Sequence, residues 1–178
     1  MFERDHPLRS QAEATVQFNG VSLHPVPPLT RLAVRAGPEA AVEVGDIFGL
    51  ALPVVPCSTS ASVDRVALWL GPDEWLVVAE EMPDWPGTEL AASIVDVSHA
   101  ITGIAVWGSR AAEAINAYCA LDLHPSAFPP SMCTRSVFAK VQIILWRIDA
   151  EVFRIEVTRS SARYVWDLLG EACREFLD

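Results

Sequence analysis

The four residues Asp96-Val97-Ser98-His99 contain every side-chain type of a hydrolytic triad. In such a triad the histidine bonds both the attacking serine and the carboxylate that orients the ring. Side chains alternate along a strand, so Asp96 and Ser98 would point to one face and His99 to the other. The chain also has no Gly-x-Ser-x-Gly nucleophile elbow. We therefore expect Asp96 and Ser98 to hydrogen-bond the backbone at a strand end and to take no part in hydrolysis.

The histidines and cysteines do not form the ligand patterns of a metal site. No histidine has a ligand-type residue three or four positions further on. No two cysteines have the two-residue spacing of zinc or redox pairs, so we expect them to be small apolar core residues in a reducing compartment. We expect no metal in this chain. These residues are His6, His24, His99 and His124, and Cys57, Cys119, Cys133 and Cys173.

The glycine spacing and the net charge argue against nucleotide cofactors and nucleic acids as ligands of this chain. The nine glycines are scattered, so the chain has neither a Walker loop nor a Gly-x-Gly-x-x-Gly turn, and we expect any flavin or nicotinamide to be held by another chain. With 13 basic and 23 acidic residues the formal charge is −10, which repels nucleic acids and anionic lipid surfaces.

From the sequence we expect neither a secretory signal nor a membrane-spanning helix. The first twenty residues have no apolar block, and Pro53 and Pro56 interrupt the longest uncharged stretch. We expect a cytoplasmic protein with no nucleic-acid or membrane partner.

The apolar content is high for a chain of 178 residues. Hydrophobic residues make up 51%, and there are six tryptophans, more than one small core readily buries. Tryptophan is enriched at the centres of protein interfaces, so we expect some indoles to contact a partner. The tryptophan candidates for an interface are Trp69, Trp75, Trp107 and Trp146.

Four arginines lie on or beside the C-terminal strands of this acidic chain: Arg135, Arg147, Arg154 and Arg159. A guanidinium on a sheet face binds carboxylates well, so Arg135 and Arg147 are further interface candidates. Pairing with Glu151 and Glu156 of the same chain is the alternative.

Hydropathy patterns and turn residues predict the elements that carry these side chains. Gly71-Pro72-Asp73 joins two apolar runs as a hairpin, and residues 94–98 and 103–107 are expected to form a second strand pair. The final helix, capped by Ser160 or Ser161, buries one apolar stripe. The other expected elements are strands over 30–36, 133–138, 141–147 and 152–157, and helices over 38–48, 88–92 and 110–118.

Strand pairs followed by helices indicate an α+β fold with mainly antiparallel sheets and covering helices. Prolines punctuate residues 1–29, which we expect to be an extended arm that wraps a neighbour, with an edge strand at most. Residues 30–178 form either one α+β domain or two small subdomains with a break near 120–131.

The segment from Ser93 to Ala117, with Asp96-x-Ser98-His99 and an alanine-rich helix, resembles the aminomethyltransferase (glycine-cleavage T-protein) superfamily, as does Leu70 to Leu76. The C-terminal motifs resemble more closely the gamma subunit of heterotetrameric sarcosine oxidase. Ser131 departs from the glycine that this resemblance leads us to expect at a tight turn. The motifs are Leu121-Asp122-Leu123, Ala127-Phe128-Pro129, Met132-Cys133-Thr134-Arg135, Leu145-Trp146-Arg147 and Ile155-Glu156-Val157, and the opening Asp5 to Leu8 also fits.

The resemblance implies a fold like the aminomethyltransferase folate-binding domain and a role in a four-chain flavoenzyme. Such a complex demethylates sarcosine oxidatively to glycine and passes the one-carbon unit to tetrahydrofolate. FAD and FMN are then expected in the beta subunit, NAD and tetrahydrofolate in alpha and zinc in delta, with none of them in gamma. This chain would be a non-catalytic subunit that contacts the alpha, beta and delta subunits and self-associates when isolated.

Two alternatives remain open at this point. One is a stand-alone folate-binding aminomethyltransferase-like protein, although such enzymes are about twice as long. The other is the gamma subunit of a related N-methyl amino acid dehydrogenase.

Overall fold

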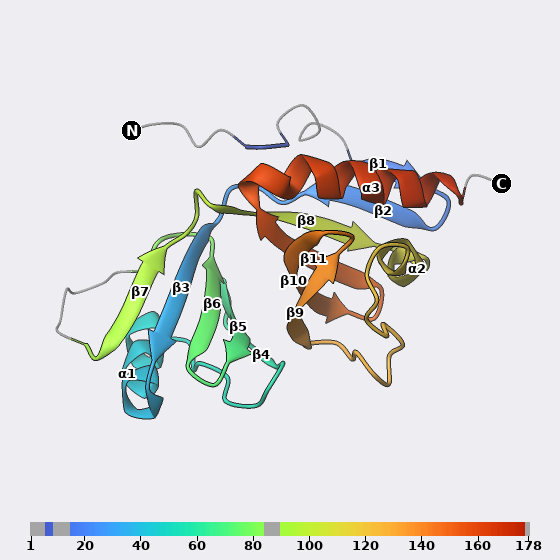
Figure 1. Cartoon of the computed structure of the whole chain (residues 1–178). Helices are drawn as coiled ribbons and strands as arrows, with labels where there is room; N and C mark the ends of the chain where they lie inside the picture. Colours follow the sequence, from blue (N-terminus) through green and yellow to red (C-terminus); the bar gives the residue numbers. More distant parts are fainter. Residues whose placement is uncertain (1–5, 9–14, 84–89, 177–178) are drawn as a thin grey trace. The chain divides into compact units, whose positions relative to one another are not determined.

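The computed structural model describes residues 6–8, 15–83 and 90–176, which form two α+β units (Figure 1). One unit joins the N-terminal residues up to Pro28 to residues 99–178, and the other comprises Leu29–Ser98. The break expected near 120–131 is therefore in the wrong place, because that loop lies within the first unit. The chain divides instead at 28/29 and at 98/99.

The first unit is built on an antiparallel six-stranded sheet (Figure 1). The three strands nearest the C-terminus of the chain lie where the sequence predicts them, because turn residues separate each from the next. The strand order is β1 (Val16–Phe18), β2 (Val21–Pro25), β8 (Ile101–Trp107), β11 (Val152–Thr158), β10 (Val141–Asp149) and β9 (Cys133–Phe138).

Two helices, α2 (Ala111–Asn116) and α3 (Ala162–Arg174), complete the core of this unit. The expected apolar stripe of α3 is confirmed: Val165, Leu169 and Cys173 are fully buried and pack in one cluster with inward-facing strand residues. Ser161 is the N-cap residue of α3, although its side chain makes no capping hydrogen bond. The opposite side of α3 carries exposed charged residues, as the sequence predicts.

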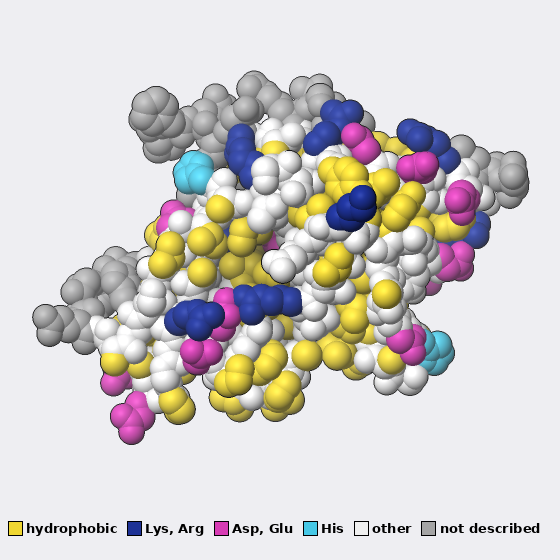
Figure 2. Space-filling view, viewed as in Figure 1, with side chains coloured by type: hydrophobic (Ala, Val, Ile, Leu, Met, Phe, Trp, Pro, Cys, Tyr) yellow, Lys and Arg dark blue, Asp and Glu magenta, His cyan; other side chains and the backbone are white. Residues whose placement is uncertain are grey.

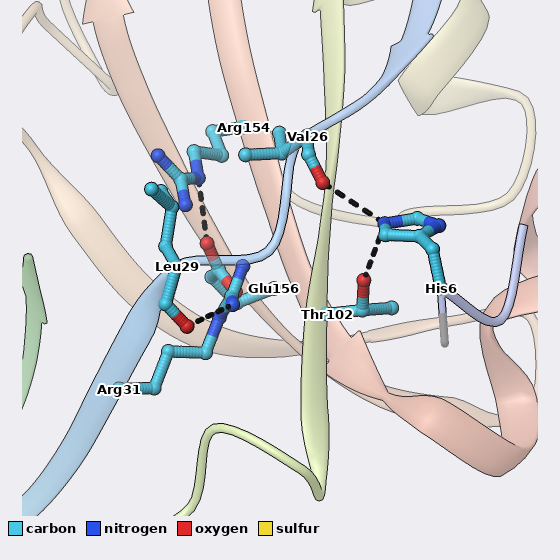
Figure 3. Close-up of polar contacts among 7 residues, drawn as sticks. All are labelled: His6, Val26, Leu29, Arg31, Thr102, Arg154 and Glu156. Atoms are coloured by element: carbon cyan, nitrogen blue, oxygen red, sulfur yellow. Dashed lines mark hydrogen bonds and ion pairs between the residues drawn. The ribbon is translucent and has the colours of Figure 1, made fainter. Parts of the chain in front are cut away.

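The described part of residues 1–29 is integrated into this first unit. β2 pairs with β8, and Leu8 is fully buried in the core. His6 Nε2 lies 2.9 Å from the Val26 carbonyl oxygen and 3.1 Å from Thr102 Oγ1. Figure 3 shows the His6 side chain between these two groups. The expectation of an arm that wraps a neighbour is therefore corrected for these residues, because their apolar side chains are buried in the chain's own core.

The described residues of the second unit form a five-stranded antiparallel sheet and one helix, α1 (Pro38–Phe48). Pro38 occupies the first turn of α1, and Gly49 ends the helix with a φ of 58°, a left-handed conformation that favours glycine. Leu32 and Val34 pack against Val44 and Phe48 in the core of this unit. The strand order is β4 (Thr59–Ala61), β5 (Arg65–Gly71), β6 (Glu74–Ala79), β3 (Thr30–Ala36) and β7 (Ala92–Asp96).

One predicted pairing is wrong. β7 and β8 are neighbours in sequence but belong to different sheets: β7 pairs with β3, and β8 pairs with β2 and β11. Directly after β7, the Ser98 N–H donates to Asp96 Oδ1 and the Val97 N–H donates to the Arg31 carbonyl of β3, so this end of β7 is bonded to β3. Of the helix expected over 88–92, residues 88–89 lie outside the described residues, and Ala92 is the first residue of β7.

Candidate interaction surface

The Asp96–Ser98 motif is structural. The Ser98 backbone N–H donates to Asp96 Oδ1 at 2.8 Å, and the Ser98 hydroxyl donates to the same oxygen. The Arg31 backbone N–H in turn donates to Ser98 Oγ at 2.9 Å. The expectation that these side chains bond backbone at a strand end is confirmed. His99 is exposed, and Ser98 is engaged in holding the end of β7 to β3.

Other candidate chemical groups also have structural positions. Among the described residues, no three His, Cys, Asp or Glu side chains are grouped as a metal site would require. The four cysteines, all among the described residues, form no disulfide bond, and three of them are buried. Burial raises the pKa of Cys173 to about 11, so this thiol stays protonated at neutral pH. No described helix is long and apolar enough to cross a membrane.

Arg154 and Glu156 form an ion pair on one face of β11 (Figure 3). Arg154 Nε donates to Glu156 Oε1 at 2.6 Å, and the Glu156 side chain is completely buried. This is the intrachain pairing that the sequence left open as the alternative to an acidic partner.

Arg147 has an internal role that corrects its selection as an interface residue. The residue is 4% exposed, and its guanidinium donates to the carbonyl oxygens of Phe128 at 2.7 Å and of Leu123 at 3.1 Å. It also donates to Asp149 and Ala150 carbonyls and stacks 4.9 Å from the Phe153 ring centroid. The guanidinium therefore holds the 121–131 loop. Arg135, on the neighbouring strand β9, is exposed.

The tryptophan candidates differ in their environments. Trp69 and Trp75 lie opposite each other across β5 and β6; Trp75 is buried, and its indole N–H donates to the Pro53 carbonyl at 2.8 Å. Trp107 and Trp146 are half-buried on the six-stranded sheet. The Trp146 indole N–H is buried and has no hydrogen-bond acceptor among the described residues. Trp85 lies outside the described residues.

The second unit carries most of the exposed large hydrophobic side chains. Of the nine among the described residues, six belong to this unit: Val42, Val54, Val55, Val63, Met82 and Val95. Figure 2 shows hydrophobic side chains gathered over the segment between α1 and β4. A surface concentration of this kind is typical of a protein contact site.

A groove of about 560 Å³ opens in this surface, and we call it the α1 groove. One wall is a helical stripe of α1 and its cap. The other consists of Leu50, Ala51, Leu52 and Val54 together with Pro72 and Trp75. Gly45 allows the two walls to meet, because a Cβ there would lie 3.2 Å from the Leu50 carbonyl oxygen. At the C-terminal end of α1, the Phe48 carbonyl accepts a hydrogen bond from the Arg65 guanidinium at 2.7 Å. The α1 stripe consists of Pro38, Ala41, Val42, Gly45, Asp46 and Gly49.

Sequence reasoning missed the α1 groove. Val42 and Val54 are unremarkable aliphatic residues in the sequence, and only their exposure, 65% and 81%, distinguishes them. Among the tryptophans chosen from the sequence, Trp75 is the one that lines this groove.

The two antiparallel sheets with few helices define an α+β protein with the fold of the aminomethyltransferase class. A solved structure of glycine cleavage system aminomethyltransferase T from Bartonella henselae matches 84% of this chain and 45% of its own, with a TM-score of 0.62 and 15% identity. At that identity the likeness concerns the fold alone.

More specific matches follow from the sequence. A family model described as "Sarcosine oxidase, gamma subunit family" matches residues 33–175. The chain belongs to the sarcosine oxidase gamma subunit family.

Individual relatives cover nearly the whole chain. Sarcosine oxidase subunit gamma from Corynebacterium sp. (strain P-1) is 30% identical over 97% of this chain and 91% of its own. The subunit gamma from an Arthrobacter species is 27% identical over 94% of this chain and 91% of its own. A solved structure of heterotetrameric sarcosine oxidase from Corynebacterium sp. U-96, in complex with pyrrole 2-carboxylate, matches with a TM-score of 0.86 and 27% identity, covering 98% of this chain and 97% of the matched chain.

Proposed function

We propose that this chain is the non-catalytic gamma subunit of a heterotetrameric sarcosine oxidase acting in the cytoplasm. The observation that carries the proposal is the near full-length match, in sequence and fold, to a chain of such an enzyme. The complex would demethylate sarcosine oxidatively to glycine and transfer the one-carbon unit to tetrahydrofolate. Its alpha, beta and delta subunits would hold the FAD, FMN, NAD, zinc and tetrahydrofolate.

The positions of the reactive side chains support a non-catalytic role. Asp96 and Ser98 hold a strand end, and the guanidinium of Arg147 is engaged with loop carbonyls. The Cys173 thiol is kept protonated by burial. Meanwhile α1 and the segment after it expose Val42, Val54 and Val55, which a partner subunit would cover.

The isolated chain tests this role. Expressed alone, it should self-associate or aggregate, form no hydrogen peroxide from sarcosine and show no flavin absorption. The same assays on the complex purified from the native host should give both turnover and a flavin spectrum. A monomeric isolated chain that oxidises sarcosine and carries flavin would overturn the proposal.

A stand-alone folate-dependent transferase is the second candidate, because the chain shares its fold with aminomethyltransferase T. The match covers 45% of that protein and is 15% identical, so it supports a shared fold and not a shared activity. Calorimetric titration of the isolated chain with tetrahydrofolate separates the two candidates, since micromolar binding would favour the transferase. Substrate profiling of the purified complex would distinguish sarcosine oxidase from a related N-methyl amino acid dehydrogenase.

A further inference from the structure

We propose that the α1 groove receives a segment of one of the larger subunits of the complex, and that this segment carries apolar side chains next to a lysine or arginine. The inference rests on the proposed function, because it presumes that the chain is a subunit. It adds the surface that makes the contact and the chemistry of the residues that fill it.

The lining of the groove favours an apolar protein segment over a small polar ligand. A volume of about 560 Å³ fits either, because small-molecule sites measure roughly 300–1,000 Å³. Small-molecule sites, however, combine apolar walls with several convergent polar groups. Asp46 is the one charged side chain in the lining, and the indole N–H of Trp75 is already bonded to Pro53.

The apolar surface extends beyond the groove. Val42 and Val54 stand at its two walls, and Val55, next to Val54, is 62% exposed. An aliphatic or aromatic anchor in a pocket, surrounded by further apolar contact, is the usual centre of a protein interface. This arrangement suits a partner that inserts a side chain and covers the surrounding valines.

The charges around the groove specify the partner further. Glu39 and Glu43 lie on the exposed side of α1, and Asp46 lines the groove. Within the described part of the chain, no ion pair involves any of these three carboxylates. A lysine or arginine beside the inserted side chain would therefore gain attraction without breaking an existing pair.

The same charges argue against a second copy as the occupant. In a two-fold dimer the same patch meets itself, so the carboxylates of α1 would face their own copies. Self-association of the isolated chain would therefore use exposed apolar side chains outside the α1 groove. A different chain with basic residues avoids this repulsion.

A matched pair of valine substitutions tests the apolar part. Val54→Asp places a carboxylate at the groove wall, whereas Val63→Asp makes the same change at a fully exposed valine of the same unit outside the groove. Each full-length variant is co-expressed with the alpha, beta and delta subunits, and its affinity for them is measured. We expect Val54→Asp to weaken binding at least tenfold and Val63→Asp to change it less than twofold. Circular dichroism spectra like that of the wild type would show that both variants fold.

A second pair tests the charge. Asp46→Lys should weaken assembly at least fivefold at low salt and reduce its salt dependence, because attraction to a basic partner becomes repulsion. Glu81→Lys, an exposed site of the same unit outside the groove, should leave both quantities unchanged. If Asp46→Lys and Glu81→Lys weakened assembly equally, only the net charge of the chain would matter. That result would overturn the proposal that Asp46 attracts a basic residue of the partner.

Photo-crosslinking identifies the occupant. A benzoylphenylalanine at position 54 should crosslink, within the assembled complex, to a peptide of a larger subunit that contains an apolar residue within two positions of a lysine or arginine. Crosslinking to a second copy, or wild-type assembly by Val54→Asp and Asp46→Lys, would overturn the inference and leave the proposed function intact. If the wild-type chain did not assemble with the other subunits, the proposed function would fail and the inference with it.

Discussion

Arg154 and Glu156 face each other on β11, with Arg154 Nε 2.6 Å from Glu156 Oε1 and with exposed side-chain fractions of 12% and 0%. The pair lies on the sheet face opposite to Ile155, which belongs to the hydrophobic core of its unit. A charge buried this deeply depends on its partner, because removing one member leaves the other desolvated and less well compensated.

Arg154→Met should therefore lower the free energy of unfolding by about 3 kcal/mol. Arg154→Met combined with Glu156→Met should recover part of that loss, because the Glu156 carboxylate is no longer buried without Arg154. Arg163→Met is the control, since Arg163 and Asp167 form an exposed pair on α3 and its loss should cost less than about 0.5 kcal/mol. Urea unfolding of the dilute chain measures all three. An Arg154→Met variant as stable as the control would contradict this account of the pair.

Arg147→Met should release the 121–131 loop. The guanidinium bonds the Leu123 and Phe128 carbonyls, and a methionine would leave these acceptors unsatisfied, at a cost of about 3 kcal/mol. Hydrogen exchange should become faster across 121–131. Arg135→Met on the exposed side of the neighbouring strand serves as the control and should leave that exchange unchanged. Unchanged exchange in Arg147→Met would refute the role assigned to this arginine.

Ser131→Gly should stabilise the chain. Ser131 has a φ of 66°, and its N–H donates to the Arg147 carbonyl at 2.8 Å, so the tight turn forms in spite of the serine. Glycine removes a steric cost of ~1–2 kcal/mol in the folded state, but its greater conformational freedom stabilises the unfolded chain by ~0.5–1 kcal/mol. The free energy of unfolding should therefore rise by roughly 0.5 kcal/mol. Ala127→Gly in the same loop relieves no positive φ, so it should lower the free energy of unfolding. If both variants changed the free energy of unfolding in the same direction, the steric explanation for Ser131 would be wrong.

Cys173 should make stability depend on pH under alkaline conditions. Its thiol pKa is raised by burial from 9.0 to about 11, so the unfolded chain loses the proton first as the pH rises. The contribution of the protonated thiol is complete below pH 9 and is lost progressively as the pH approaches 11. The urea midpoint of the wild type should fall more steeply between these values than that of Cys173→Val. Parallel slopes would mean that Cys173 does not titrate differently in the folded state.

Local patterns were enough to predict many of the elements. The alternation of Leu32 and Val34 with charged residues predicted β3, and Gly71-Pro72-Asp73 predicted the β5–β6 hairpin, because these signals lie within a few residues. The family was also recognised from C-terminal motifs, and the match over residues 33–175 confirms it.

Pairing and burial could not be predicted in the same way. The choice of β3 over β8 as the partner of β7 depends on contacts about sixty residues apart. Whether Arg147 faces a partner or its own loop depends on where Leu123 and Phe128 are placed by the fold. The α1 groove joins residues from 38 to 75, and its apolar side chains have no distinctive spacing.

Affinity purification from the native host tests most directly whether this chain is a docking subunit of an amine-oxidising complex. A tag on this chain should recover the three other subunits in equal amounts, as mass spectrometry would show, together with flavin and sarcosine-oxidising activity. Recovery of the chain alone, or with partners that contain no flavin and do not oxidise N-methyl amines, would contradict the claim.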